Sequence, residues 1–264
     1  MNIFFHELKV YRKSIIIWSC SMTLLSVMYI LIFKEIGPDI ESFKTYLDNM
    51  PDAIKKIFNI CISSISTLEG FYTFIFSFVA LCGSIQAMNI GTDIVSKEIR
   101  ENTADFLIAK PLSRTNIMTS KLIAALSALI ITNIIYLAFT ILSAFIAVSH
   151  FNLKLFFMIS ITLFFMQLIF LALGIMISVL VRKIKSVISV SLSTVFGFYI
   201  LGSLGAIIGE ERVRYFSPFR YFDSVYILQH SSYELSYMFI GIVFFIGAIT
   251  ASYLVFLKKD IHSI

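Results

Sequence analysis

The residues best suited to chemistry gather in one polar segment, KEIRENTADFLIAKPLSRTNIMTSK, at residues 97–121. Charged residues crowd together there, although they make up only 14% of the chain. Apolar and acidic positions form neighbouring stripes, which predicts an amphipathic helix from Asp93 to about Ala109. Pro111 breaks this helix, and Ser113 or Thr115 can cap the next one. A polar helix of this kind can dock on a partner and transmit force; the alternative is a solvated connecting loop.

Catalytic side chains elsewhere do not form a recognised site. The four histidines are scattered, and no HExxH motif occurs. The pair Glu210–Glu211 with Arg212 and Arg214 resembles the Glu-Glu-Arg motif of intramembrane CAAX-type proteases, but the arginine spacing differs and no histidine motif follows. We therefore interpret these charges as a solvated loop. The three cysteines have neither metal-site nor redox-pair spacing, so free thiols and no metal site are expected.

A nucleotide-binding loop is also missing from the sequence. No GxxxxGK[ST] motif occurs, so no phosphate-cradling loop is expected in this chain. The sequence therefore predicts a protein that is not itself an enzyme and binds no cofactor. If it works against a gradient, the energy must come from a partner.

Hydrophobic patterning shows which elements hold the polar segment. Hydrophobic residues make up 58% of the 264 residues, and the mean hydropathy is +0.90. Long apolar blocks predict six membrane-spanning helices, since about 20 residues cross the hydrocarbon core. We therefore expect an all-α integral membrane protein with a single membrane domain over residues 1–264. The predicted spans are approximately 14–33, 70–92, 121–149, 155–181, 187–208 and 235–257.

Charge placement predicts the orientation of the spans. With both termini in the cytoplasm, 13 of the 21 Lys and Arg residues lie inside and eight lie outside. The predicted coupling segment, residues 93–120, then connects the second and third spans in the cytoplasm. No cleavable signal peptide is expected, because the first apolar run is long enough to remain as a span. Residues 1–13 have amphipathic spacing, which favours a short helix at the membrane interface over a simple basic flank.

Polar residues inside the spans bear on the transport mechanism. Ionisable residues are confined to the span ends, which argues against an ion-coupled carrier or channel that acts without an ATPase. That class stays the alternative, because backbone carbonyls can also bind ions. The strong polar residues within the spans are Gln86, Asn89, Asn133 and Gln167.

Small residues recur every four positions in two runs along the fifth span and its end, a spacing that lets helices approach closely. They predict helix packing, either within the chain or between two copies. The residues concerned are Ser189, Ser193, Gly197, Gly205 and Gly209.

Residues 91–122, GTDIVSKEIRENTADFLIAKPLSRTNIMTSKL, resemble the cytoplasmic signature of bacterial ATP-binding-cassette (ABC) permeases of type 2. That family has a glutamate-bearing helix, then Gly-Thr and a Leu-Leu-x-x-Pro-x-Ser-Arg turn. Asn102 stands where the family has glycine. Residues 46–58, YLDNMPDAIKKIF, resemble the family's proline-containing loop after the first span. The matching residues are Glu98, Glu101, Thr103, Phe106, Leu107, Pro111, Ser113 and Arg114, with Lys121 opening the next span.

The resemblance implies an exporter subunit in the plasma membrane. A coupling helix would dock on a separate cytoplasmic ATPase subunit, which would bind ATP and Mg²⁺. Two permease copies, identical or different, would complete the unit in the lipid bilayer, with no nucleic acid involved. Polar docking would fall to Glu98, Arg100 and Glu101, apolar contacts to Phe106 and Leu107, and the turn to Pro111, Ser113 and Arg114.

Overall fold

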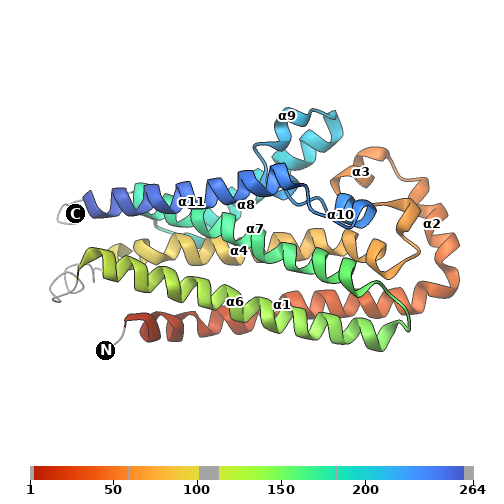
Figure 1. Ribbon diagram of the computed structural model, residues 1–264, viewed down its shortest axis with the longest axis horizontal. Coiled ribbons are helices and arrows are strands. Elements are labelled where there is room, and N and C mark those ends of the chain that lie inside the picture. The colour runs from red at the N-terminus through yellow and green to blue at the C-terminus, as the bar shows by residue number, and fades with distance from the viewer. Residues whose placement is uncertain (1–2, 59, 101–112, 182, 259–264) are drawn as a thin grey trace.

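The computed structural model describes residues 3–58, 60–100, 113–181 and 183–258, and its long elements are all helices (Figure 1). Six of these helices are long and apolar enough to cross a membrane, and they match the six predicted spans in order. The prediction of an all-α integral membrane protein is therefore confirmed. The six are α1 (Ile3–Ile36), α4 (Leu68–Arg100), α6 (Arg114–Ala147), α7 (Leu153–Leu180), α8 (Val187–Ile208) and α11 (Leu235–Lys258).

Short helices gather at one end of the bundle. Figure 1 shows α2, α3 and α10 at the end opposite to the one where α1 begins and α11 ends. This arrangement fits an even number of membrane crossings. The short elements are η1 (Gly37–Asp39), α2 (Ile40–Asp48), α3 (Asp52–Ile57), η2 (Ile62–Ser64), α9 (Glu211–Arg214), η3 (Pro218–Arg220) and α10 (Ser224–His230).

The amino-terminal residues continue directly into the first span. We expected a separate interfacial helix over residues 1–13, but α1 is continuous from Ile3 to Ile36. No glycine or proline interrupts the sequence until Gly37, so nothing breaks the helix earlier. Its 34 residues extend about 51 Å, well beyond a hydrocarbon core of about 30 Å. The helix is therefore longer than the hydrocarbon core is thick, and Glu7 and Tyr11 in its first turns are buried against the bundle.

The second span also runs on further than its apolar block. Its predicted end was residue 92, whereas α4 continues to Arg100 and takes in the first eight residues of the predicted coupling segment. Ile94, Val95 and Ser96 are buried, so packing against the neighbouring helices holds this extension in place. The rest of the predicted amphipathic helix lies in residues 101–112, outside the described residues.

The core of the bundle is the crossing of α4 and α7. In each of them about seven-tenths of the most apolar stretch is buried, whereas for α8 the share is 17%. A Cβ atom on Gly91 would lie 2.4 Å from the Leu171 carbonyl oxygen, and one on Gly174 would lie 2.7 Å from the Met88 carbonyl oxygen. The two backbones therefore touch where both helices have glycine.

Two helix ends use capping residues that are evident in the sequence. The Ser113 hydroxyl accepts a hydrogen bond from the Asn116 amide at 3.2 Å, which fixes the start of α6 as predicted. Gly209 has a φ of +77° and ends α8, a backbone conformation that glycine adopts without steric cost. The first cap fixes where α6 begins, and the second fixes where α8 ends.

Candidate functional site

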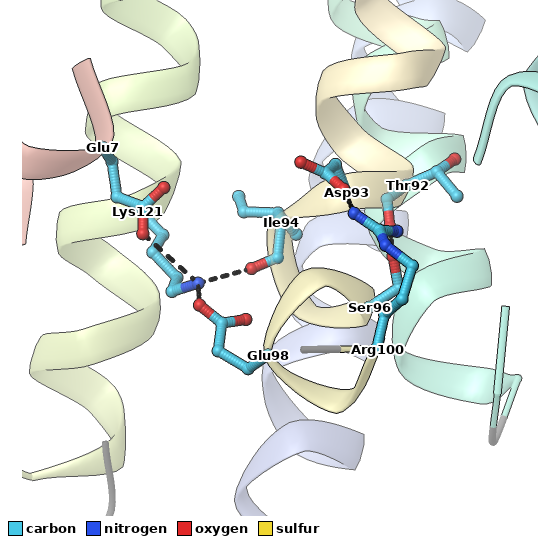
Figure 2. Close-up of polar contacts among 8 residues, drawn as sticks. All are labelled: Glu7, Thr92, Asp93, Ile94, Ser96, Glu98, Arg100 and Lys121. Carbon is cyan, nitrogen blue, oxygen red and sulfur yellow. Dashed lines mark hydrogen bonds and ion pairs between the residues drawn. The ribbon is translucent and has the colours of Figure 1, made fainter. Parts of the chain in front are cut away.

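A buried ion cluster joins three helices at the end of the bundle where α1 begins (Figure 2). The Lys121 ammonium, on α6, forms an ion pair with the Glu98 carboxylate at the end of α4. It lies 3.6 Å from Glu7 Oε1 on α1 and donates a hydrogen bond of 2.7 Å to the Ile94 carbonyl oxygen. Lys121 is only 2% exposed, so one cation holds two carboxylates and a backbone oxygen.

The cluster depends on helix extensions that reach past the apolar blocks. Glu7 lies in the second turn of α1, Glu98 in the last turn of α4 and Lys121 in the third turn of α6. Buried charges are costly unless they are paired and hydrogen-bonded, so these three side chains stabilise one another only while the helices stay together. The arrangement can lock the relative positions of α1, α4 and α6.

Other polar contacts surround the ends of the predicted coupling segment. Arg100 forms an ion pair with Asp93 on the side of α4 that faces away from the cluster (Figure 2). The distance between Arg100 Nη2 and Asp93 Oδ1 is 2.8 Å. Arg114 donates a hydrogen bond of 3.4 Å to the Leu257 carbonyl oxygen, which connects the start of α6 to the end of α11. The coupling segment is thus attached on both sides to helices of the bundle.

The structure separates the predicted docking residues into three groups. Glu98 is largely enclosed, with its side chain 14% exposed, because it pairs with Lys121. Arg100 is exposed, and Ser113 and Arg114 lie at the start of α6. Their role in docking stays a prediction. The remaining predicted residues lie outside the described residues: Glu101, Thr103, Phe106, Leu107 and Pro111.

The small residues predicted to pack helices have different surroundings. Ser189 bonds to Ser186 at the start of α8, and a Cβ on Gly205 would lie 2.8 Å from Val213 Cγ1. Ser193 is exposed, and a Cβ on Gly197 would meet nothing within 4 Å. Gly209 serves as the cap described above. Contact between two copies through this face stays a prediction.

A second polar cluster lies deep in the bundle, away from the helix ends. The Gln167 amide on α7 donates to Gln86 Oε1 on α4 at 3.1 Å, and the Gln86 amide donates to Thr132 Oγ1 on α6 at 2.9 Å. The Asn133 amide donates to Gln167 Oε1 at 2.5 Å. Within lipid, such bonds between side-chain amides hold helices together, and they set the registers of α4, α6 and α7.

Most of these residues could be singled out from the sequence, but the contacts between them could not be predicted. Gln86, Asn133 and Gln167 stand out as strong polar residues within apolar spans, and the structure brings them together. The cluster of Glu7, Glu98 and Lys121 was missed. Its only sequence signal is that each charged residue lies within about two helical turns of an apolar block, where burial can reach it.

The whole chain resembles a family of known proteins. The model of a family described as ABC-2 family transporter protein matches residues 1–261. No curated protein matches the chain. The family match includes the three helices of the ion cluster and both ends of the coupling segment.

Proposed function

Because the chain belongs to the ABC-2 family of transporter proteins, and is therefore the permease of an ABC transporter, we propose that it serves an ATP-driven exporter. In this proposal a separate ATPase subunit supplies the motion, and two permease copies enclose the pathway. The termini and the coupling segment face the cytoplasm, and the membrane is the plasma membrane. ATP and Mg²⁺ bind to the ATPase subunit.

The buried ion cluster is the observation that carries this proposal. Glu98 lies near the start of the coupling segment and Lys121 directly follows its end, and the ion pair between them holds the two sides of the segment together. A displacement of the segment is then passed to α4 and α6 together, and through Glu7 to α1. Glu98 acts in this way as a positioning residue for the segment, while exposed neighbours make the contact with the ATPase.

Cargo chemistry follows from the character of the helices. The exposed faces of α8 and α11 are apolar, with side chains such as Ile200 and Phe239 more than half exposed. A pathway built by such faces favours amphipathic or hydrophobic cargo over a bare ion.

Reversing the charge at Glu101 tests the docking role. We expect Glu101→Lys to reduce the amount of ATPase that co-purifies with the permease by about tenfold or more, since a like charge in a docking contact costs several kcal/mol. The measurement is recovery of candidate ATPases with the full chain from solubilised membranes. Glu98→Lys would be less informative, because it would place a second ammonium beside Lys121 in the buried cluster.

Glu41→Lys provides the matched control. Glu41 is exposed on α2, at the opposite end of the bundle, and the change in charge is the same. It should leave ATPase recovery unchanged. Equal recovery with Glu101→Lys and Glu41→Lys would contradict the docking assignment, and transport by the purified chain without any ATPase would contradict the proposed function.

A further inference from the structure

A small cavity opens at the end of the bundle opposite to the ion cluster. It has a volume of about 40 Å³ and lies between α3, α4, α7, α8 and the loop that contains η3. One water molecule needs roughly 10–15 Å³ of such space, so the cavity can hold a group of about three waters, the size of a phosphate. A whole drug-sized molecule does not fit.

Positive charge distinguishes the lining of this cavity. Lys56 on α3 and Arg220 on η3 both contribute to it, and among the described residues that line it none is acidic. Arg220 Nη2 lies 3.9 Å from Asp223 Oδ2, and a guanidinium has five N–H donors, so it can bind several oxygen atoms at once. Two cations around a phosphate-sized space favour an anion.

Lys56 differs from the lysine beside it. Lys55 pairs with Asp52 at 2.9 Å and donates to the Asp48 carbonyl oxygen, and its ammonium lowers the pKa of the Asp52 carboxyl. Lys56 has no ion-pair partner among the described residues. Lys55 therefore stabilises α3, whereas the Lys56 ammonium can interact with a ligand in the cavity.

Hydroxyl groups add further donors to the lining. Tyr199 on α8 and Ser224 on α10 line the cavity, and each carries a hydroxyl group. The Tyr199 ring is held edge-on against Phe219, with 5.5 Å between ring centroids. These hydroxyls can each donate a hydrogen bond to an anionic oxygen.

The loop that carries Arg220 is fixed before any ligand arrives. The Ser217 hydroxyl donates to the Phe198 carbonyl oxygen at 2.8 Å, and Arg214 Nε donates to the Arg220 carbonyl oxygen at 2.9 Å. Gly202 lets the loop lie against α8, since a Cβ there would be 2.5 Å from Ser217 Oγ and 3.3 Å from Arg220 Cγ. A site formed in advance avoids the entropic cost of ordering a loop on binding.

An apolar stripe on α8 leads away from the cavity toward the middle of the helix. Leu192 and Phe196 precede Tyr199 and Ser203 at spacings of four, three and four residues, which puts all four on one face. Leu192 is 36% exposed and Phe196 is 43% exposed. A molecule with its headgroup in the cavity can therefore lay an acyl chain along α8.

From this geometry we infer that the cavity binds the anionic headgroup of a phosphate-bearing amphiphile whose chain lies over Phe196 and Leu192. The inference is independent of the docking role proposed above, because it concerns the other end of the bundle. Binding can be measured on the full chain without an ATPase, so the two proposals can fail separately.

Titration of the detergent-purified full chain with short-chain lipids tests the site. Phosphatidylglycerol should bind about tenfold more tightly than phosphatidylcholine of the same chain length, because the second headgroup carries a compensating cation. Lys56→Gln should weaken phosphatidylglycerol binding by roughly tenfold. Tyr199→Phe keeps the ring and should weaken binding about threefold. Inorganic phosphate should compete only at much higher concentration.

Lys154→Gln is the matched control for Lys56→Gln. Lys154 is exposed in the first turn of α7, at the same end of the bundle, and does not line the cavity. Phosphatidylglycerol binding should be unchanged in this variant. Equal affinity for the two lipids, or equal effects of the two lysine variants, would overturn the proposal. Inorganic phosphate that binds as tightly as phosphatidylglycerol would overturn the part played by the acyl chain.

Discussion

Lys121→Met should destabilise the protein by about 3–5 kcal/mol, the usual cost of removing one partner from a buried ion pair. Methionine fills most of the space of the lysine stem, so the loss comes from charge rather than from a cavity. Glu98 and Glu7 would then lie close together without their shared cation, and the Ile94 carbonyl would lose a hydrogen bond. Thermal unfolding of the full chain in detergent measures the effect.

A second substitution separates charge from packing in this cluster. Adding Glu98→Gln to Lys121→Met removes one unpaired carboxylate and should restore part of the lost stability, with a coupling of about 0.5–3 kcal/mol. Lys9→Met, at an exposed position on α1, should change stability by less than about 0.5 kcal/mol. The structural role assigned to the ion cluster would be contradicted if Lys121→Met and Lys9→Met unfolded at the same temperature. It would also be contradicted if adding Glu98→Gln to Lys121→Met restored no stability.

Gly91→Ala should destabilise the bundle by about 1–3 kcal/mol or more, because the added methyl group forces apart two backbones that already touch. Its Cβ would lie 2.4 Å from the Leu171 carbonyl oxygen and 3.1 Å from Gly174 Cα, and neither backbone atom can rotate away. The measurement is again thermal unfolding in detergent, together with the yield of folded protein.

The matched control is the same change at Gly197 on α8. A Cβ there meets nothing within 4 Å, and alanine forms helix better than glycine, so Gly197→Ala should be neutral or stabilise the protein by up to about 1 kcal/mol. Equal stability losses for the two variants would show that the crossing of α4 and α7 is not the tight contact. A loss at Gly197 alone would point to a contact outside the isolated chain.

The number and order of the spans could be predicted from the sequence. In lipid each helix must satisfy its backbone hydrogen bonds internally, and crossing the hydrocarbon requires a long apolar run. Helix ends were less accessible. The apolar block of α4 ends near residue 92, but burial of Val95 and Ser96 against neighbouring helices carries the helix on to Arg100. Such packing depends on partners that are distant in the chain, so hydropathy alone does not reveal it.

The same limit applies to predictions of helix packing from glycine spacing. The spacing of Gly197 with its neighbours in α8 predicts close packing, and the tightest glycine contact between the backbones of two spans lies at Gly91 and Gly174. Gly83, Ala87 and Gly91 have the same four-residue spacing in α4, so the signal was present there also. Spacing marks helices that are able to approach closely, and only the fold decides which of them do.

The hydrogen bond between the side-chain amides of Gln86 on α4 and Gln167 on α7 imposes an order on the assembly of the protein in the membrane. Gln86 accepts its bond from a residue 81 positions later, so α4 is made and enters the membrane well before that partner exists. At roughly 5–20 residues per second, synthesis of the intervening chain takes about 4–16 s. During that interval the Gln86 side chain lacks the α7 bond in surroundings that offer little water. Insertion of α4 and assembly of the bundle are therefore separate events, and the emergence of the fourth membrane helix is the step that completes the core.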